Sequence, residues 1–168
     1  MTRLGADIGL VGLTFAAFGL GVVVISPLAG RWSDRHGPVP LIVPGTLGMA
    51  LAGTLYPALA TPVLVVPVVI FEGVAEGLLG PALYAVVARG TPAARSATAQ
   101  GVFGAAGTLG TMVAAVVAGT LFARDVHLPF YTFVVVILAS LAVGLAIARN
   151  SLRLPEPVAS GGEVTAST

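Results

Sequence analysis

Cysteine and lysine are both absent from this chain of 168 residues, and charged residues of either sign are scarce. Without cysteine the chain can form neither a disulfide nor a thiolate site. Only 9% of its residues are charged, whereas soluble domains carry about 25%. The formal net charge is +1, and no basic run is present that could neutralise nucleic-acid phosphates. These shortages argue against a soluble domain, a disulfide scaffold and a nucleic-acid partner.

Apolar sequence dominates what remains. Hydrophobic residues make up 57% of the chain, and the mean hydropathy is +1.01, which indicates an integral membrane protein. A membrane-spanning helix needs about 20 apolar residues. Five runs reach that length, at 8–28, 39–60, 63–88, 97–123 and 128–148. Because the runs lack the alternation of a transmembrane barrel, we predict an all-α membrane protein with five transmembrane helices.

The arginines predict the orientation of these runs, because cytoplasmic loops are enriched in basic residues. With alternating spans, Arg3 and Arg124 lie on one side of the membrane, and the other six arginines lie on the opposite side. We therefore expect residues 1–7 to be extracytoplasmic and the tail, 151–168, to be cytoplasmic. The polar tail, rich in proline and glycine, is also expected to be disordered. The bias towards Ala, Gly, Val, Pro and Arg suggests a bacterial source, and thus the bacterial cell (inner) membrane.

A short charged stretch, Gly-Arg-Trp-Ser-Asp-Arg-His-Gly at 30–37, separates the first two runs and is expected to form a tight turn. Its pattern, Gly-x-x-x-Asp-Arg-x-Gly, resembles the cytoplasmic loop signature of the major facilitator superfamily of secondary transporters. The matching positions are Gly30, Asp34, Arg35 and Gly37. Pro38 and Val39 replace the basic pair that closes the family pattern. The sequence 91–101 is similar to the family's entry into the fifth helix of a six-helix half, where an Arg precedes small residues and a Gly.

The resemblance implies two six-helix halves, each built from inverted three-helix repeats. The signature lies between the second and third helices of a half, so the five runs correspond to helices two to six, and the first helix is missing. First halves often carry an Arg in the fourth helix, three residues before Gln-Gly. Here Val69 holds that place and Glu72-Gly73 follows. We therefore interpret residues 8–150 as helices 8–12 of a twelve-helix transporter, its C-terminal half without the first helix. The missing N-terminal half would be its partner.

The resemblance also implies a role for Asp34. Its carboxylate would meet the start of the fourth run near Ser96, where the partial positive charge of a helix N-terminus favours an anion, with Arg95 as a charged neighbour. This contact would form in one access state and break in the other, and so act as a latch. Gly30 and Gly37 would allow the close approach and the tight turn. The alternative is a solvated turn that only enforces topology.

Glu72 and Glu76 are acidic residues inside a predicted span, four residues apart and thus on one helix face. A rise of about 1.5 Å per residue from Val63 places them roughly 14 and 20 Å into the membrane. Transporters bind substrates and coupling ions at that depth, and two carboxylates one turn apart do not both ionise easily. We predict substrate binding or proton coupling here, with Glu76 as the first choice. The alternative is that one glutamate is a protonated structural hydrogen-bonding group.

Small residues and prolines in the runs predict how the helices pack. Gly73-x-x-x-Gly77 predicts the close approach of another helix, and a stripe of small residues on the fourth run predicts ordinary helix packing. That stripe consists of Ala106, Gly110, Ala114 and Ala118. The Gly80-Pro81 step, one turn after Glu76, predicts a bend in the third run.

Three classes of function remain. The first is secondary transport of a small molecule with proton coupling, as part of a permease or efflux protein. The second is a truncated, non-transporting fragment or assembly subunit of the same ancestry. The third, an intramembrane enzyme, is disfavoured because Gly-x-Ser-x-Gly, His-Glu-x-x-His and Gly-x-x-x-x-Gly-Lys are all absent. We thus expect no catalytic residue, metal site or cofactor. The expected partners are the lipid bilayer, a small-molecule substrate and protons.

Overall fold

Five long helices form the part of the chain that the computed structural model describes, residues 8–151. They are α1 (Ile8–His36), α2 (Val39–Leu55), α3 (Val65–Arg89), α4 (Ser96–Arg124) and α5 (Leu128–Ser151). With the short turns that adjoin them, all five are long and apolar enough to cross a membrane. The predicted all-α membrane architecture is therefore confirmed. The predictions for segment 1–7 and for tail residues 152–168 lie outside the described residues.

The first helix is longer than the sequence predicted. It continues beyond residue 28, through the charged stretch, as far as His36. The residues from Arg31 to Arg35 are compatible with a helix, and the backbone leaves the helical conformation at Gly37, whose φ is 87°. Glycine adopts such a positive φ without the steric cost that other residues pay. The expectation of a turn that begins at Gly30 is therefore wrong, because the turn is made at Gly37 and Pro38.

Short 3₁₀ turns account for the other boundaries. The second helix ends at Leu55, before the predicted residue 60, because η2 (Tyr56–Ala58) contains Pro57, which has no backbone donor to continue the helix. A second turn, η3 (Pro62–Leu64), precedes α3, and η4 (Ala93–Arg95) precedes α4. The third, fourth and fifth helices begin and end within about three residues of the predicted runs, as sequence-based boundaries commonly do.

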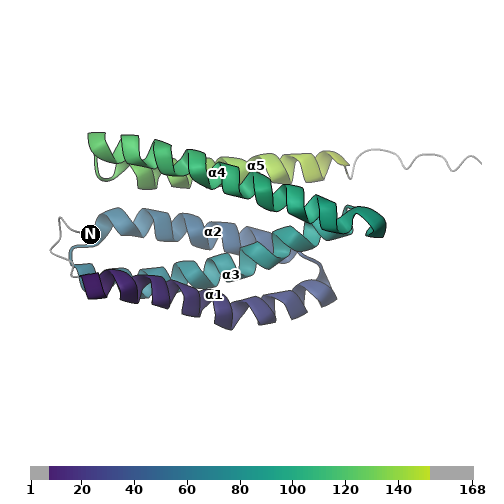
Figure 1. Cartoon of the computed structure of the whole chain (residues 1–168), viewed down its shortest axis with the longest axis horizontal. Helices are drawn as coiled ribbons and strands as arrows, with labels where there is room; N and C mark the ends of the chain where they lie inside the picture. The colour runs from purple at the N-terminus through teal and green to yellow at the C-terminus, as the bar shows by residue number, and fades with distance from the viewer. Residues whose placement is uncertain (1–7, 152–168) are drawn as a thin grey trace, which may run out of the picture.

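Helix α3 lies at the centre of the group formed by α1, α2 and α3. It packs along both α1 and α2, which contact each other little. Helix α5 packs on α2, and α4 reaches α3 mainly at one end, where the rings of Tyr84 and Phe103 meet edge to face at 5.1 Å. Figure 1 shows the result: α1, α2 and α3 form one group, and α4 and α5 lie together on one side of it.

Glycines make the closest helix contacts. A Cβ added at Gly21 of α1 would lie 2.6 Å from the carbonyl oxygen of Ile70, and one added at Gly73 would collide with the carbonyl oxygen of Phe18. One added at Gly77 would overlap the side chain of Ile25. The prediction that Gly73-x-x-x-Gly77 admits a neighbouring helix is thus confirmed, and that helix is α1. Helix α3, which carries the two glutamates, is therefore packed closely against the backbone of α1.

Candidate functional site

The signature stretch forms the last two turns of α1 and the turn after it. The amide of Gly37 donates to the carbonyl oxygen of Ser33 at 2.9 Å, which closes the helix end. Ser33 is buried at 2% exposure, and its hydroxyl has no hydrogen-bond partner among the described residues. A Cβ added at Gly30 would meet no described atom within 4 Å. The close approach expected at Gly30 is therefore absent here, whereas Gly37 makes the tight turn.

Arg89, the last residue of α3, holds this end of α1. Its Nη2 donates to the carbonyl oxygen of Ser33 at 2.8 Å, and a Cβ added at Gly37 would lie 3.7 Å from its Nη1. A cation at the carbonyl ends of helices is favoured by the partial negative charge there. Sequence reasoning used Arg89 only to orient the chain. The one signal in the sequence that could have singled out Arg89 is its place at the end of an apolar run that contains two glutamates.

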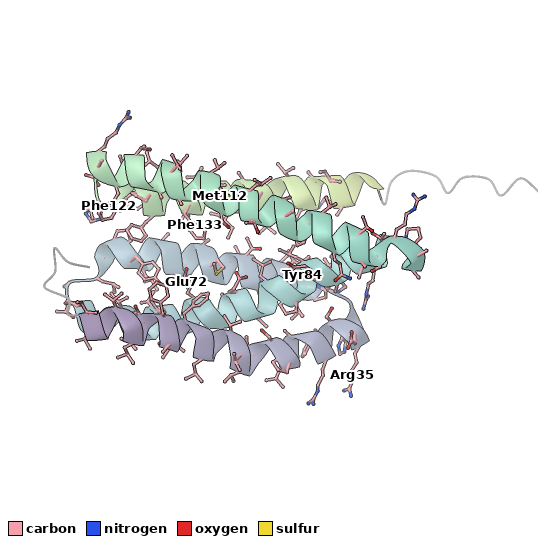
Figure 2. The ribbon with its side chains drawn as sticks, viewed as in Figure 1. Arg35, Glu72, Tyr84, Met112, Phe122 and Phe133 are labelled. Carbon is pink, nitrogen blue, oxygen red and sulfur yellow. The ribbon has the colours of Figure 1, made fainter. Side chains whose placement is uncertain are left out.

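Asp34 and Arg35 take no part in the hydrogen bond between Arg89 and Ser33. Both side chains are exposed, and Figure 2 shows Arg35 extending from the bundle at the end of α1. Arg95 is exposed too, and in the described part of the chain no hydrogen bond or ion pair joins it to Asp34. Helix α4 starts without a side-chain cap and without an acidic residue in its first turn. Its N-terminus thus lacks a local anion, and the latch between Asp34 and α4 stays a prediction.

The two glutamates of α3 have different surroundings. Glu72 is half-buried and accepts a hydrogen bond from the hydroxyl of Tyr56, which belongs to η2 at the end of α2. The ring of Tyr56 also contacts that of Phe130 on α5, with centroids 5.5 Å apart. Glu72 thereby joins a contact among α2, α3 and α5, and lies between the helices in Figure 2. Tyr56 was missed from the sequence because it is 16 residues from Glu72.

Glu76 lies one turn further along α3 and is also half-buried. Its side chain has no hydrogen bond or ion pair within residues 8–151. One carboxylate oxygen leans towards Gly80, where an added Cβ would lie 3.4 Å from it. The helix continues through Pro81 to Arg89 without interruption. Glu76 is thus a half-buried carboxyl group within an apolar span, and its role in coupling or substrate binding stays a prediction.

Comparisons with known proteins show which family the chain resembles. A sequence model described as Major Facilitator Superfamily matches residues 1–167. "Multidrug resistance protein 2" of Bacillus subtilis (strain 168) is 29% identical over 147 residues, which are 87% of this chain and 36% of that protein. "Multidrug resistance protein 1" of the same organism is 27% identical over 92% of this chain and 40% of its own length. "Uncharacterized MFS-type transporter YwoD", also from B. subtilis, is 30% identical over 62% of this chain. The chain therefore spans about two fifths or less of the length of these relatives.

Proposed function

The chain belongs to the Major Facilitator Superfamily, and on that premise we propose that it forms part of a secondary transporter that moves a small molecule across the bacterial cell membrane with proton coupling. The five apolar helices support the membrane location. Two relatives of this chain are named multidrug resistance proteins, which supports export as the direction. A proton gradient would supply the free energy for that export.

Glu76 is the observation that carries the proton coupling. An ionised carboxylate is costly inside the hydrocarbon region, so acidic residues there face a protein interior or a water-filled cavity, or bind a proton. Glu76 is half-buried at mid-span without a described partner. Glu72, by contrast, accepts the Tyr56 hydroxyl. Protonation of Glu76 in one access state and its release in the other would couple proton movement to transport, and a cationic substrate could compete for the same carboxylate.

The orientation and the partner belong to the same proposal. The end of the bundle with Gly37 and Arg89 faces the cytoplasm, in accord with the arginine distribution. In this orientation the tail is cytoplasmic as well. The remaining helices of the transporter, including the N-terminal half, complete the cavity wall opposite Glu76. The five helices correspond to helices 8–12 of the twelve.

A second candidate is a membrane fragment that does not transport by itself. The observation in its favour is that α4, among the described residues, has none that is buried. A helix that packs so little contributes little stability, because helix association in membranes depends on close packing and interhelical hydrogen bonds. On this reading the chain transports only when the rest of a transporter is present.

The deciding experiment compares Glu76→Gln with Glu72→Gln in the transporter that contains this chain, reconstituted in liposomes. The amide keeps the shape of the carboxyl group but cannot bind and release the proton. We expect Glu76→Gln to abolish accumulation driven by an imposed pH gradient and to keep downhill exchange. Glu72→Gln should retain most of the accumulation, because Glu72 serves the contact with Tyr56. Full proton-coupled accumulation by Glu76→Gln would make this glutamate structural and refute the proposed coupling.

A further inference from the structure

A cavity of about 430 Å³ lies between α2, α3 and α5. Small-molecule pockets in proteins are mostly apolar and measure about 300–1,000 Å³, and none of the described residues that line this cavity is charged. Its wall on α5 extends from Ile137 to Ala148, which corresponds to roughly 16 Å of helix. A helix about 10 Å across would occupy roughly 1,200 Å³ over that length. The cavity is therefore too small for another helix and has the size of a small-molecule site.

Two hydroxyl groups interrupt the apolar wall, those of Thr46 on α2 and Ser140 on α5. Thr46 is only 5% exposed, and its hydroxyl has no hydrogen-bond partner within residues 8–151. Other threonines in these helices donate to a carbonyl of the preceding turn, as Thr54 does to Leu51. A buried hydroxyl without a partner is unfavourable. Thr46 therefore marks the point of the cavity where an occupant can supply a hydrogen bond.

The two hydroxyl groups lie at the same level of the bundle. Helices α2 and α5 run in opposite directions (Figure 1), and a Cβ added at Gly53 of α2 would lie 3.0 Å from Cδ1 of Phe133 on α5. Seven residues back along α2 and seven forward along α5, the same register sets Thr46 opposite Ser140. The hydroxyl of Ser140 donates to the carbonyl oxygen of Val136 at 2.8 Å, so its oxygen remains an acceptor. The pair thus offers one donor and one acceptor to an occupant.

We propose that this cavity binds a small, uncharged, apolar molecule with one hydroxyl group, which accepts a hydrogen bond from Thr46 and donates one to Ser140. The oxygen of an alcohol does both at once. From Thr46 the wall continues over seven residues to Val39, about 10 Å. The hydroxyl of the ligand therefore lies at mid-span, and its apolar body extends towards the end of the bundle that carries Gly37.

The arrangement of the cavity separates this ligand from a phospholipid. A phospholipid would place its headgroup at the Val39 end and an acyl chain against the two hydroxyl groups, which would leave Thr46 without a partner. The site goes beyond the proposed proton coupling, because Glu76 does not line the cavity.

Photolabelling with an eight-carbon alcohol that carries a diazirine tests the site. The purified full chain is reconstituted in lipid vesicles and irradiated with this probe, and the labelled residues are identified by mass spectrometry. We expect the labels on the cavity residues of α2, α3 and α5. At equal mole fraction in the lipid, 1-octanol should compete about fivefold better than octane, the ratio that corresponds to about 1 kcal/mol for one hydrogen bond.

Two threonine variants of α2 show whether the hydroxyl of Thr46 makes that distinction. Thr46→Val keeps the shape of the side chain and removes the hydroxyl, so the preference for octanol over octane should disappear. Thr54→Val is the control and should keep the preference, since Thr54 is exposed and its hydroxyl is bonded to Leu51. Labels spread evenly over the five helices, or a preference that Thr46→Val retains, would overturn the proposal.

A pair of glycine variants tests the cavity by filling it. Gly144 on α5 lines the cavity and Gly119 on α4 does not, and a Cβ added at either would meet no described atom within 4 Å. Gly144→Leu should lower labelling of the cavity residues by about fivefold or more, and Gly119→Leu should leave it unchanged. Equal labelling of the two variants would refute the site. Because neither flux nor a pH gradient is measured, failure here is distinct from failure of proton coupling at Glu76.

Discussion

The two carboxyl groups of α3 have the same chemistry but different neighbours. Glu72 accepts a hydrogen bond from Tyr56, whereas Glu76 has no such partner among the described residues. A hydrogen bond to a buried carboxyl group fixes its position and ties the elements that carry the two groups. Glu72 thus connects the end of α2 to α3, and Glu76 is the carboxyl group to which we assign proton exchange in the proposed transporter.

The first prediction at this scale concerns Tyr56. Tyr56→Phe removes the hydroxyl and keeps the ring against Phe130, so it should destabilise the purified chain by about 1–2 kcal/mol. Unfolding by sodium dodecyl sulfate in mixed micelles measures this loss. The matched control is Tyr131→Phe, since Tyr131 is exposed and its hydroxyl has no described partner. Combined with Glu72→Gln, the Tyr56 change should cost less than it does alone. Strict additivity of the two changes would show that the hydrogen bond contributes nothing.

The contacts of these residues also show the limit of sequence reasoning. Spacing predicted that Glu72 and Glu76 share a helix face, because four residues complete about one turn. It could not find Tyr56, 16 residues from Glu72, or the contact of Arg89 with Ser33, which joins residues 56 apart. Such pairs arise when separate helices pack, and the helical period carries no information about that packing.

At the scale of elements, the helices themselves were predictable, because apolar runs bounded by polar or proline-rich segments leave few alternatives in a membrane. The exception is the end of α1. Charge suggested a loop from Gly30, but a charged segment stays helical when its residues tolerate the helix. The helix therefore ended where the backbone required glycine, at Gly37, and not where the sequence ceased to be apolar.

The contact between α1 and α3 leads to a prediction about packing. Gly73→Ala would force a methyl group onto the carbonyl of Phe18, and overpacking of this kind costs about 1–3 kcal/mol. Gly107→Ala on α4 is the control, because its added Cβ meets no described atom and alanine favours a helix by roughly 0.5–1 kcal/mol. In mixed micelles, the free energy of unfolding should be lower for Gly73→Ala than for the unchanged chain. For Gly107→Ala it should be equal to that of the unchanged chain or higher. The reverse order would refute the close contact between these helices.

The prediction for Asp34 concerns the relation of α1 to α4. Helix α4 begins without a side-chain cap or a first-turn acid, so an approaching carboxylate would gain about 0.3–2 kcal/mol. In the complete transporter, Asp34→Asn should therefore shift the balance of access states and lower flux at an unchanged amount of protein in the membrane. Accessibility of introduced thiols measures that balance, with Arg35→Gln as the neighbouring control. If Asp34→Asn leaves both flux and access balance unchanged, Asp34 is only a topology marker.

At the scale of the whole molecule, the two groups of helices differ in how completely they are packed. Helices α1, α2 and α3 share a core of small buried residues, whereas α4 contributes no buried residue to the described part. Hydropathy treats all five runs alike, so this difference was invisible in the sequence. The difference arises because a helix with neighbours on both sides, such as α3 between α1 and α2, can bury more of its residues. The sparsely packed helices of the described part are therefore α4 and α5.

The last prediction concerns how the molecule lies in the membrane. Six of the eight arginines lie on the side of Gly37 and the tail in the predicted topology, so that side should be cytoplasmic. Single cysteines should be placed at exposed positions, which excludes Ser33, at 2% exposure, as a reporter. His36 after the charged stretch and Thr61 between α2 and α3 are both exposed. In intact cells, an impermeant thiol reagent should label Thr61→Cys and leave His36→Cys unlabelled until the membrane is permeabilised. Labelling of His36→Cys from outside would reverse the orientation, and Asp34 could then no longer belong to a cytoplasmic latch.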